Sequence, residues 1–243
     1  MRRKVQRPGV ISSVQVTDYL HVPEFLVESY EGLLEELAGE ARQLQPWRPN
    51  EFDQRAAALH EASHCVVAAR EGYPLKSARI FRSHDNWLGD FWIDRPLRTM
   101  HSDMRSPEYL AHLRIALAGR RGELLFRGCE FCLRAGLEEL AYVLIMIMPA
   151  LAFAYPDDHG ERCLEKHYAP FWGTMLAEVD ETLLAHSAVV HAIAEILIKQ
   201  STASKRQLAS ALAAVPARTE PPRIRSLDEL SITAHDPLAH GKR

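Results

Sequence analysis

Five consecutive residues, His60-Glu61-Ala62-Ser63-His64, combine two imidazoles and a carboxylate at a spacing that could hold a metal ion. If the segment is helical, the two histidines lie about 40° apart around the helix axis and one turn from each other. Two imidazoles in that relation can both bind one Zn²⁺ ion. Glu61 lies beside the first histidine, where it could act as general base toward a water on the metal. The pattern therefore predicts a hydrolytic zinc site with His60 and His64 as ligands and Glu61 as the catalytic residue.

A catalytic zinc site takes three protein ligands and leaves a fourth position open. The extended motif H-E-x-x-H-x-x-G-x-x-H would need glycine at 67 and histidine at 70. The chain has Val67 and Arg70 at these positions. The third ligand must therefore come from elsewhere, most naturally from a carboxylate on another helix.

The motif lies in a stretch that is predicted to be helical. Asn50 is a suitable N-cap, and Gly72 followed by Pro74 is typical of a helix end. Small and apolar residues flank the motif on both sides, so we expect this helix to be buried. Further helices are predicted over 17–45, 106–126, 135–154, 171–199 and 204–214.

Two short strands are predicted over 76–82 and 89–94, joined by a polar loop at 83–88. Together with the helices they indicate a mainly α protein with one small β-sheet, in the α+β class. A chain of 243 residues is expected to form one compact domain with additional terminal elements. We predict an N-terminal arm and amphipathic helix over 1–49, a main domain over 50–215 and a mostly disordered tail over 216–243.

Composition excludes several classes of protein. With 29 Lys+Arg against 32 Asp+Glu, the chain lacks the basic excess that is typical of nucleic-acid binders. Four cysteines do not make a disulfide framework, and no secretory signal is visible, so a cytoplasmic location is expected. The most apolar stretch, Leu140–Tyr155, is shorter than the roughly 20 residues of a membrane span and contains Pro149. We interpret it as a core helix and expect no membrane span.

Three features in order resemble the peptidase domain of FtsH-type zinc metallopeptidases. They are the segment HEASHCVVA at 60–68, the strand pair after it, and the segment AGRRGELLF at 118–126. The resemblance covers about 50–145, and the helices over 171–214 are similar in pattern. It implies that 50–215 is an FtsH-like, zincin-like helical metallopeptidase domain that binds Zn²⁺.

The resemblance also implies a third zinc ligand. In the family, an aspartate in a turn after the second helix completes the site, and counting onward from Ala118 puts this position at Glu139. Glu138 is the alternative, because a slip of one residue would exchange the two. Glutamate in place of aspartate is a departure from the family, and so is Ser63 where the family has glycine.

No G-x-x-x-x-G-K-[ST] loop occurs in the sequence, so we do not expect the ATP-driven module of the family. The resemblance then implies an ATP-independent endopeptidase acting on flexible or unfolded polypeptides. It could act alone, as a homo-oligomer, or with a protein partner or an ATPase in trans. The strand near 89–93 could bind substrate along its edge, or could simply be an edge strand. The alternative function is a non-catalytic relative that acts as an interaction or regulatory module.

A second group of metal-ligating types is formed by Cys129, Cys132, Cys163 and His167. These residues could form a structural zinc site, and such a site could even be the only metal site of the protein. The favoured interpretation is that the cysteines are small buried apolar residues, as Cys65 is expected to be. The remaining isolated histidines are interpreted as surface or hydrogen-bonded residues: His84, His101, His112, His159, His186 and His191.

Overall fold

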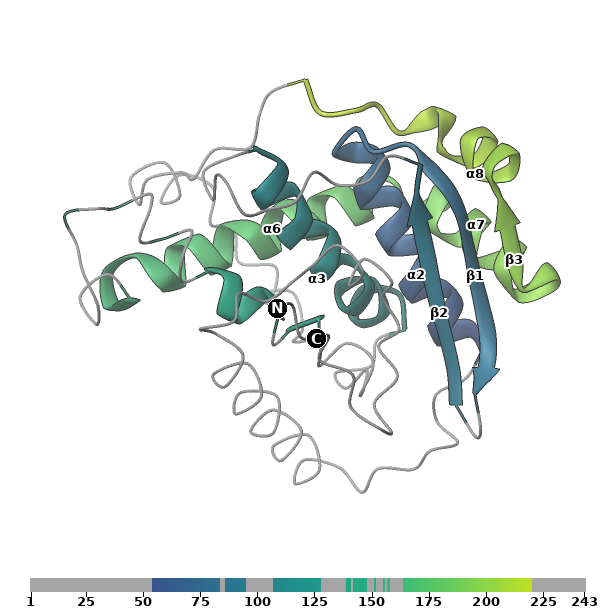
Figure 1. Ribbon diagram of the computed structural model, residues 1–243, viewed down its shortest axis with the longest axis horizontal. Helices are drawn as coiled ribbons and strands as arrows, with labels where there is room; N and C mark the ends of the chain where they lie inside the picture. Colours follow the sequence, from purple (N-terminus) through teal and green to yellow (C-terminus); the bar gives the residue numbers. More distant parts are fainter. Residues whose placement is uncertain are drawn as a thin grey trace, which may run out of the picture.

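The computed structural model describes residues 54–83, 86–94, 107–127, 139–140, 142–147, 151, 155, 157 and 164–219 (Figure 1). This part of the chain is mainly helical with one small antiparallel sheet, which confirms the predicted fold class. The helix predicted over 17–45 and most of the tail predicted over 216–243 lie outside the described residues. The domain boundaries therefore stay predictions.

Helix α2 (Gln54–Arg70) contacts α3 (Pro107–Arg127), α7 (Ser187–Gln200) and both long strands of the sheet. Every residue from 56 to 68 is buried, so the helix is covered on all sides. This explains why it carries no apolar stripe on one face only. The helix ends as predicted, because Gly72 follows its last turn with a φ of 83°.

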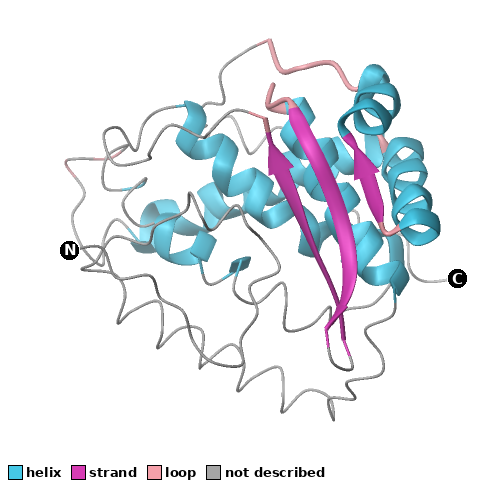
Figure 2. Ribbon diagram, turned by 45° about the vertical axis from the view of Figure 1, so that its right-hand side comes forward, coloured by secondary structure: helices cyan, strands magenta, loops and turns pink. Residues whose placement is uncertain are grey.

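Three antiparallel strands form the sheet in the order β2-β1-β3 (Figure 2). They are β1 (Leu75–Ser83), β2 (Asn86–Ile93) and β3 (Thr202–Ser204). The prediction of a loop over 83–88 is wrong, because 86–88 pair with 81–83 and continue the two strands. Strand β3 was not predicted, since three residues are too few to show a period. Its Ala203 is fully buried and pairs with Ala78.

The single helix predicted over 171–199 is also wrong. The structure has α6 (Ala169–Ala185) and α7, separated at His186, with a bend of 74° between 166–185 and 187–200. No glycine or proline marks the break. Its physical reason is tertiary packing, because α6 lies against α3 whereas α7 lies against α2. Within the described residues no single helix is long and apolar enough to cross a membrane, and only this bent pair meets those criteria together.

Other predicted helices agree with the structure where it describes them. Helix α3 begins at Pro107, as the Ser-Pro signal predicts. Described residues between 139 and 151 are helical, and Val143, Met146 and Ile147 are buried in the core. Helix α8 (Lys205–Ala211) begins after a capping box of Ser204 and Gln207 and continues into η5 (Leu212–Ala214).

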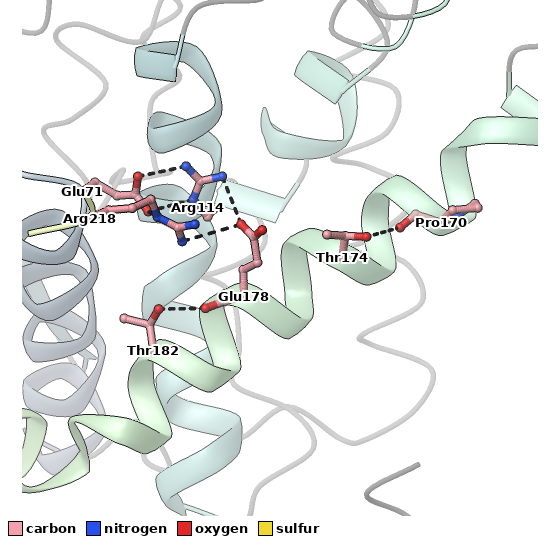
Figure 3. A network of polar contacts seen from close by, with 7 residues as sticks. All are labelled: Glu71, Arg114, Pro170, Thr174, Glu178, Thr182 and Arg218. Carbon is pink, nitrogen blue, oxygen red and sulfur yellow. Dashed lines mark hydrogen bonds and ion pairs between the residues drawn. The ribbon is translucent and has the colours of Figure 1, made fainter. Parts of the chain in front are cut away.

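A network of four charged side chains joins the end of α2 to α3, α6 and the C-terminal segment (Figure 3). Arg114 donates from Nε and Nη2 to the two carboxylate oxygens of Glu71, at 2.8 and 2.9 Å, and its Nη1 lies 3.3 Å from Glu178. Arg218 lies 3.4 Å from Glu71 and 3.7 Å from Glu178. We call these four residues the arginine–glutamate network.

Candidate metal centre

The structure brings His60, His64 and Glu139 together in one buried group. One potential ligand atom of each lies within 4.8 Å of the others. Oε1 of Glu139 lies 3.1 Å from Nε2 of His60 and 3.3 Å from Nε2 of His64. All three side chains are at most 6% exposed. The group could therefore hold a metal ion, and we call it the metal centre. Glu138, the alternative ligand, lies outside the described residues.

The other nitrogen of each ring has a fixed partner. Nδ1 of His60 lies 2.7 Å from Oε1 of the buried Glu123, and Nδ1 of His64 lies 2.7 Å from the carbonyl oxygen of Ile115. A carbonyl and a carboxylate only accept, so both Nδ1 atoms donate. Without a metal ion, Nε2 of His60 donates a hydrogen bond to Oε1 of Glu139 at 3.1 Å. A metal ion would replace this proton and bind the lone pair on Nε2 of the neutral ring.

Helix α3 approaches the rings of His60 and His64 closely at Gly119. A Cβ atom at this position would lie 2.3 Å from Nε2 of His60 and 2.5 Å from Nε2 of His64. Any residue larger than glycine at this position would therefore collide with both rings and drive the two Nε2 atoms away from Glu139. Two histidines with one carboxylate are a donor set that zinc accepts.

A second glycine of α3 makes space for Ser63, the residue that stands where the FtsH-type family has glycine. Its hydroxyl donates to the carbonyl oxygen of Leu59 at 2.7 Å. A Cβ atom on Gly122 of α3 would lie only 1.8 Å from this hydroxyl oxygen. The two helices therefore approach each other closely at a serine and a glycine, and the serine leaves the spacing of the two histidines undisturbed.

Glu61 lies in α2 beside the metal centre and is 1% exposed. Neither of its carboxylate oxygens has a hydrogen-bond partner within the described part of the chain. Burial raises the pKa of Glu61 well above its ordinary value, and the neighbouring His60 only partly opposes this. Buried polar atoms are nearly always hydrogen-bonded in folded proteins. A carboxylate of this kind beside a set of metal donors is therefore suited to exchange a proton with a small polar ligand.

Charge is unevenly matched around these residues. Burial disfavours the charged form of His60, but Glu139 and Glu123 outweigh it and raise the pKa of this histidine well above its ordinary value. Burial disfavours the charged form of Glu139 too, yet His60 and His64 lower its pKa to about 2. Three buried carboxyl groups thus lie near two imidazoles, and a divalent cation bound there would compensate the negative charge of ionised carboxylates.

Three residues that shape this site were not predicted as functional: Glu123, Gly119 and Gly89. Gly119 and Glu123 are four residues apart on α3 and so lie on the same face of that helix, which was a usable signal. Gly89 approaches Glu61 from β2, and nothing local in the sequence indicates that approach. Cys65 is fully buried in the core, as predicted.

Of the proposed cysteine site, only His167 lies within the described residues. Its ring is buried and stacks on Tyr155, with 3.5 Å between the ring centres. Cys129, Cys132 and Cys163 lie outside the described residues, so a second zinc site stays a prediction.

Comparison with known proteins identifies no relative. No protein-family model matches the chain, and no curated protein matches its sequence. The resemblance to the FtsH-type peptidase domain thus stays a prediction that rests on the motif, the order of the elements and the position of Glu139.

Proposed function

We propose that this protein is a zinc-dependent, ATP-independent endopeptidase that hydrolyses peptide bonds in flexible or unfolded polypeptides. The observation that carries the proposal is the carboxylate of Glu61, which is buried without a hydrogen-bond partner among the described residues. In the sequence of α2 it stands between His60 and His64, whose Nε2 atoms face Glu139. Buried carboxylates that serve only the fold are normally hydrogen-bonded, so this one supports a role in chemistry.

In this proposal His60, His64 and Glu139 hold the ion. A bound zinc ion would polarise the scissile carbonyl and lower the pKa of water. Glu61 takes the proton of the attacking water and passes it to the leaving amine. Glu123 fixes the orientation of His60 and thereby the direction of its Nε2 atom.

The sheet supports an extended polypeptide as the substrate. Strand β2 is an outer strand in the order β2-β1-β3, and its residues Gly89 and Phe91 lie against Glu61 and His64. A peptide that added to the outer edge of β2 would run past the metal centre. Pairing through the backbone selects for an extended chain and not for a sequence, which suits flexible or unfolded polypeptides.

Zinc content tests the metal centre. We expect one zinc ion per chain in the purified wild type and none after His64→Ala, measured by elemental analysis of folded protein. His191→Ala is the matched control, because His191 lies on α7 against Phe126 and outside the metal centre, so zinc is retained. Zinc content unchanged by His64→Ala would refute the metal centre and favour the cysteine site.

Activity tests the chemistry. Glu61→Gln keeps the shape of the side chain but cannot accept the proton, so we expect kcat/KM on an unfolded polypeptide to fall by about 10²–10⁴-fold. Zinc content and folding are expected to stay as in the wild type, since Glu61 is not a ligand. A wild type that binds zinc at His64 but cleaves no polypeptide would favour the non-catalytic interaction module.

A further inference from the structure

The backbone of β2 passes directly over the side chain of Glu61 at Gly89. A Cβ atom at Gly89 would lie 2.3 Å from Cγ of Glu61, 2.5 Å from Oε1 and 2.6 Å from Cδ. Real Cβ atoms essentially never approach other heavy atoms this closely. Gly89 is itself buried. The side chain of Glu61 therefore occupies the volume that any larger residue at position 89 would fill.

Backbone conformation does not explain this glycine. Among the glycines that the structure describes, only Gly72 has a positive φ. The pairing of β1 with β2 is regular from Ser77 to Ser83, with Ile80 opposite Gly89, and the one register shift lies between Leu75 and Ser77. A glycine within a regular strand then indicates a close approach and not a turn or a bulge.

Two alternate positions of β2 face α2 over the metal centre. Phe91 stacks on the ring of His64, with 5.0 Å between the ring centres and 17° between the planes. Gly89, two residues before it on the same face, lies over Glu61. Strand β2 thus packs Phe91 on His64. At Gly89 it has no side chain, and the carboxylate of Glu61 fills that space.

We propose that Gly89 is a positioning residue, whose missing side chain makes the space that holds the carboxylate of Glu61 beside the metal centre. With a larger residue at position 89, the carboxylate would have to turn away or β2 would have to move outward. The inference rests on the proposed role of Glu61 as general base. It adds a requirement on β2 that the motif in α2 does not contain.

A double-mutant cycle separates this role from a general structural one. Gly89→Ala, Glu61→Ala and the double variant are compared with the wild type by thermal unfolding. We expect Gly89→Ala to lower Tm by about 5 °C in the wild type. We expect the same change to lower Tm by much less in Glu61→Ala, because the three atoms it collides with are gone. Gly173→Ala is the control, since a Cβ atom there meets nothing within 4 Å.

The catalytic readout is taken from Gly89→Ala alone. Zinc content is expected to stay at the wild-type value, because the three atoms nearest to the added Cβ all belong to Glu61. We expect kcat to fall by about 10–100-fold, since a displaced general base cannot reach its proton. A variant that binds zinc, folds and has lost kcat is the signature of a misplaced base.

Equal Tm losses in both backgrounds would overturn the role of Gly89, and so would a Gly89→Ala variant with wild-type Tm and kcat. If Gly89→Ala does not fold alone, recovery of folding in the double variant supports the proposal, and failure of both variants refutes it. A wild type without peptidase activity refutes the proposed function instead. The cycle on Tm then still reports whether Gly89 makes the space for Glu61.

Discussion

Two clusters of buried or partly buried charged side chains lie against α2 and α3, and they differ in how their charges are matched. In the arginine–glutamate network, two carboxylates face two guanidinium groups, and each group lies within 4 Å of an opposite charge. In the metal centre and its surroundings, three buried carboxylates face two imidazoles. There, Glu61, Glu123 and Glu139 each have at least one oxygen without a hydrogen-bond partner among the described residues.

This difference favours a structural role for the first cluster and a binding role for the second. Buried charges that are paired within the chain hold elements together, and removing one partner leaves the other uncompensated. Buried polar atoms without a hydrogen bond among the described residues can take a partner such as water, a ligand or an ion. The three carboxyl groups near the metal centre would suit a cation as that partner. In the arginine–glutamate network Nε of Arg218 also lacks a hydrogen bond among the described residues, but it lies 3.4 Å from Glu71.

The largest effect on stability is expected from removing one side chain of the arginine–glutamate network. Arg114→Met leaves Glu71 and Glu178 with Arg218 as their only described guanidinium partner, so the free energy of unfolding is expected to fall by about 3–5 kcal/mol. Urea unfolding measures the loss, and zinc content per folded chain stays unchanged because the ligands are not touched. Arg121→Met on the same helix is the control. Its partner Asp180 is 23% exposed, so a smaller loss is expected.

The pH dependence of stability tests a third buried group. Helix α3 carries His112, which belongs neither to the arginine–glutamate network nor to the metal centre. Burial lowers the pKa of His112 to about 4, and its ring lies against Tyr73. The unfolded chain takes up this proton near pH 6.5 and the folded chain near pH 4, so stability is full above that range and falls as the pH falls through it. We expect a loss of about 2 kcal/mol at pH 5. In metal-free protein, His112→Gln is expected to remove this loss of stability, measured by urea unfolding at pH 7 and pH 5. An undiminished pH dependence in the variant would show that His112 is not its cause.

A substitution beside the metal centre is expected to change mainly the affinity for metal. Glu123→Gln keeps an acceptor for Nδ1 of His60 but removes a negative charge, so zinc affinity is expected to fall by about 10–100-fold. Competition with a chelator measures the change, and thermal unfolding of the metal-free protein checks that the fold persists. An equal affinity in the variant would mean that Glu123 only fills space beside the histidine.

The parts that the sequence predicted depend on short-range patterns. The helix of His60 and His64, its end at Gly72 and the start of α3 at Pro107 each follow from neighbouring residues. Glu139 came from counting along a resemblance, because its approach to α2 is a long-range contact. The bend at His186 could not be predicted, since the two halves of that apolar stripe turn to different partner helices.

The same limit applies to the sheet and to the surroundings of the site. Strand β3 exists because Ala203 completes a buried pairing with β1, and three residues carry no period of their own. Glu123 and Gly89 act on residues of α2 that are distant in sequence. Local patterns therefore predicted which residues could carry the chemistry, whereas tertiary contacts decide which residues hold them in place.

The smallest effect is expected where a charge pair is matched but not buried. Nη1 of Arg55 lies 3.3 Å from Oε1 of Glu195, and the two side chains are 57% and 44% exposed. Because water solvates both partners after the pair is broken, Arg55→Ala is expected to cost less than about 1 kcal/mol. Urea unfolding at low salt and at about 1 M salt checks this, since screening removes an exposed interaction but not a buried one. A loss as large as that of Arg114→Met would show that pairing alone, and not burial, makes the arginine–glutamate network important.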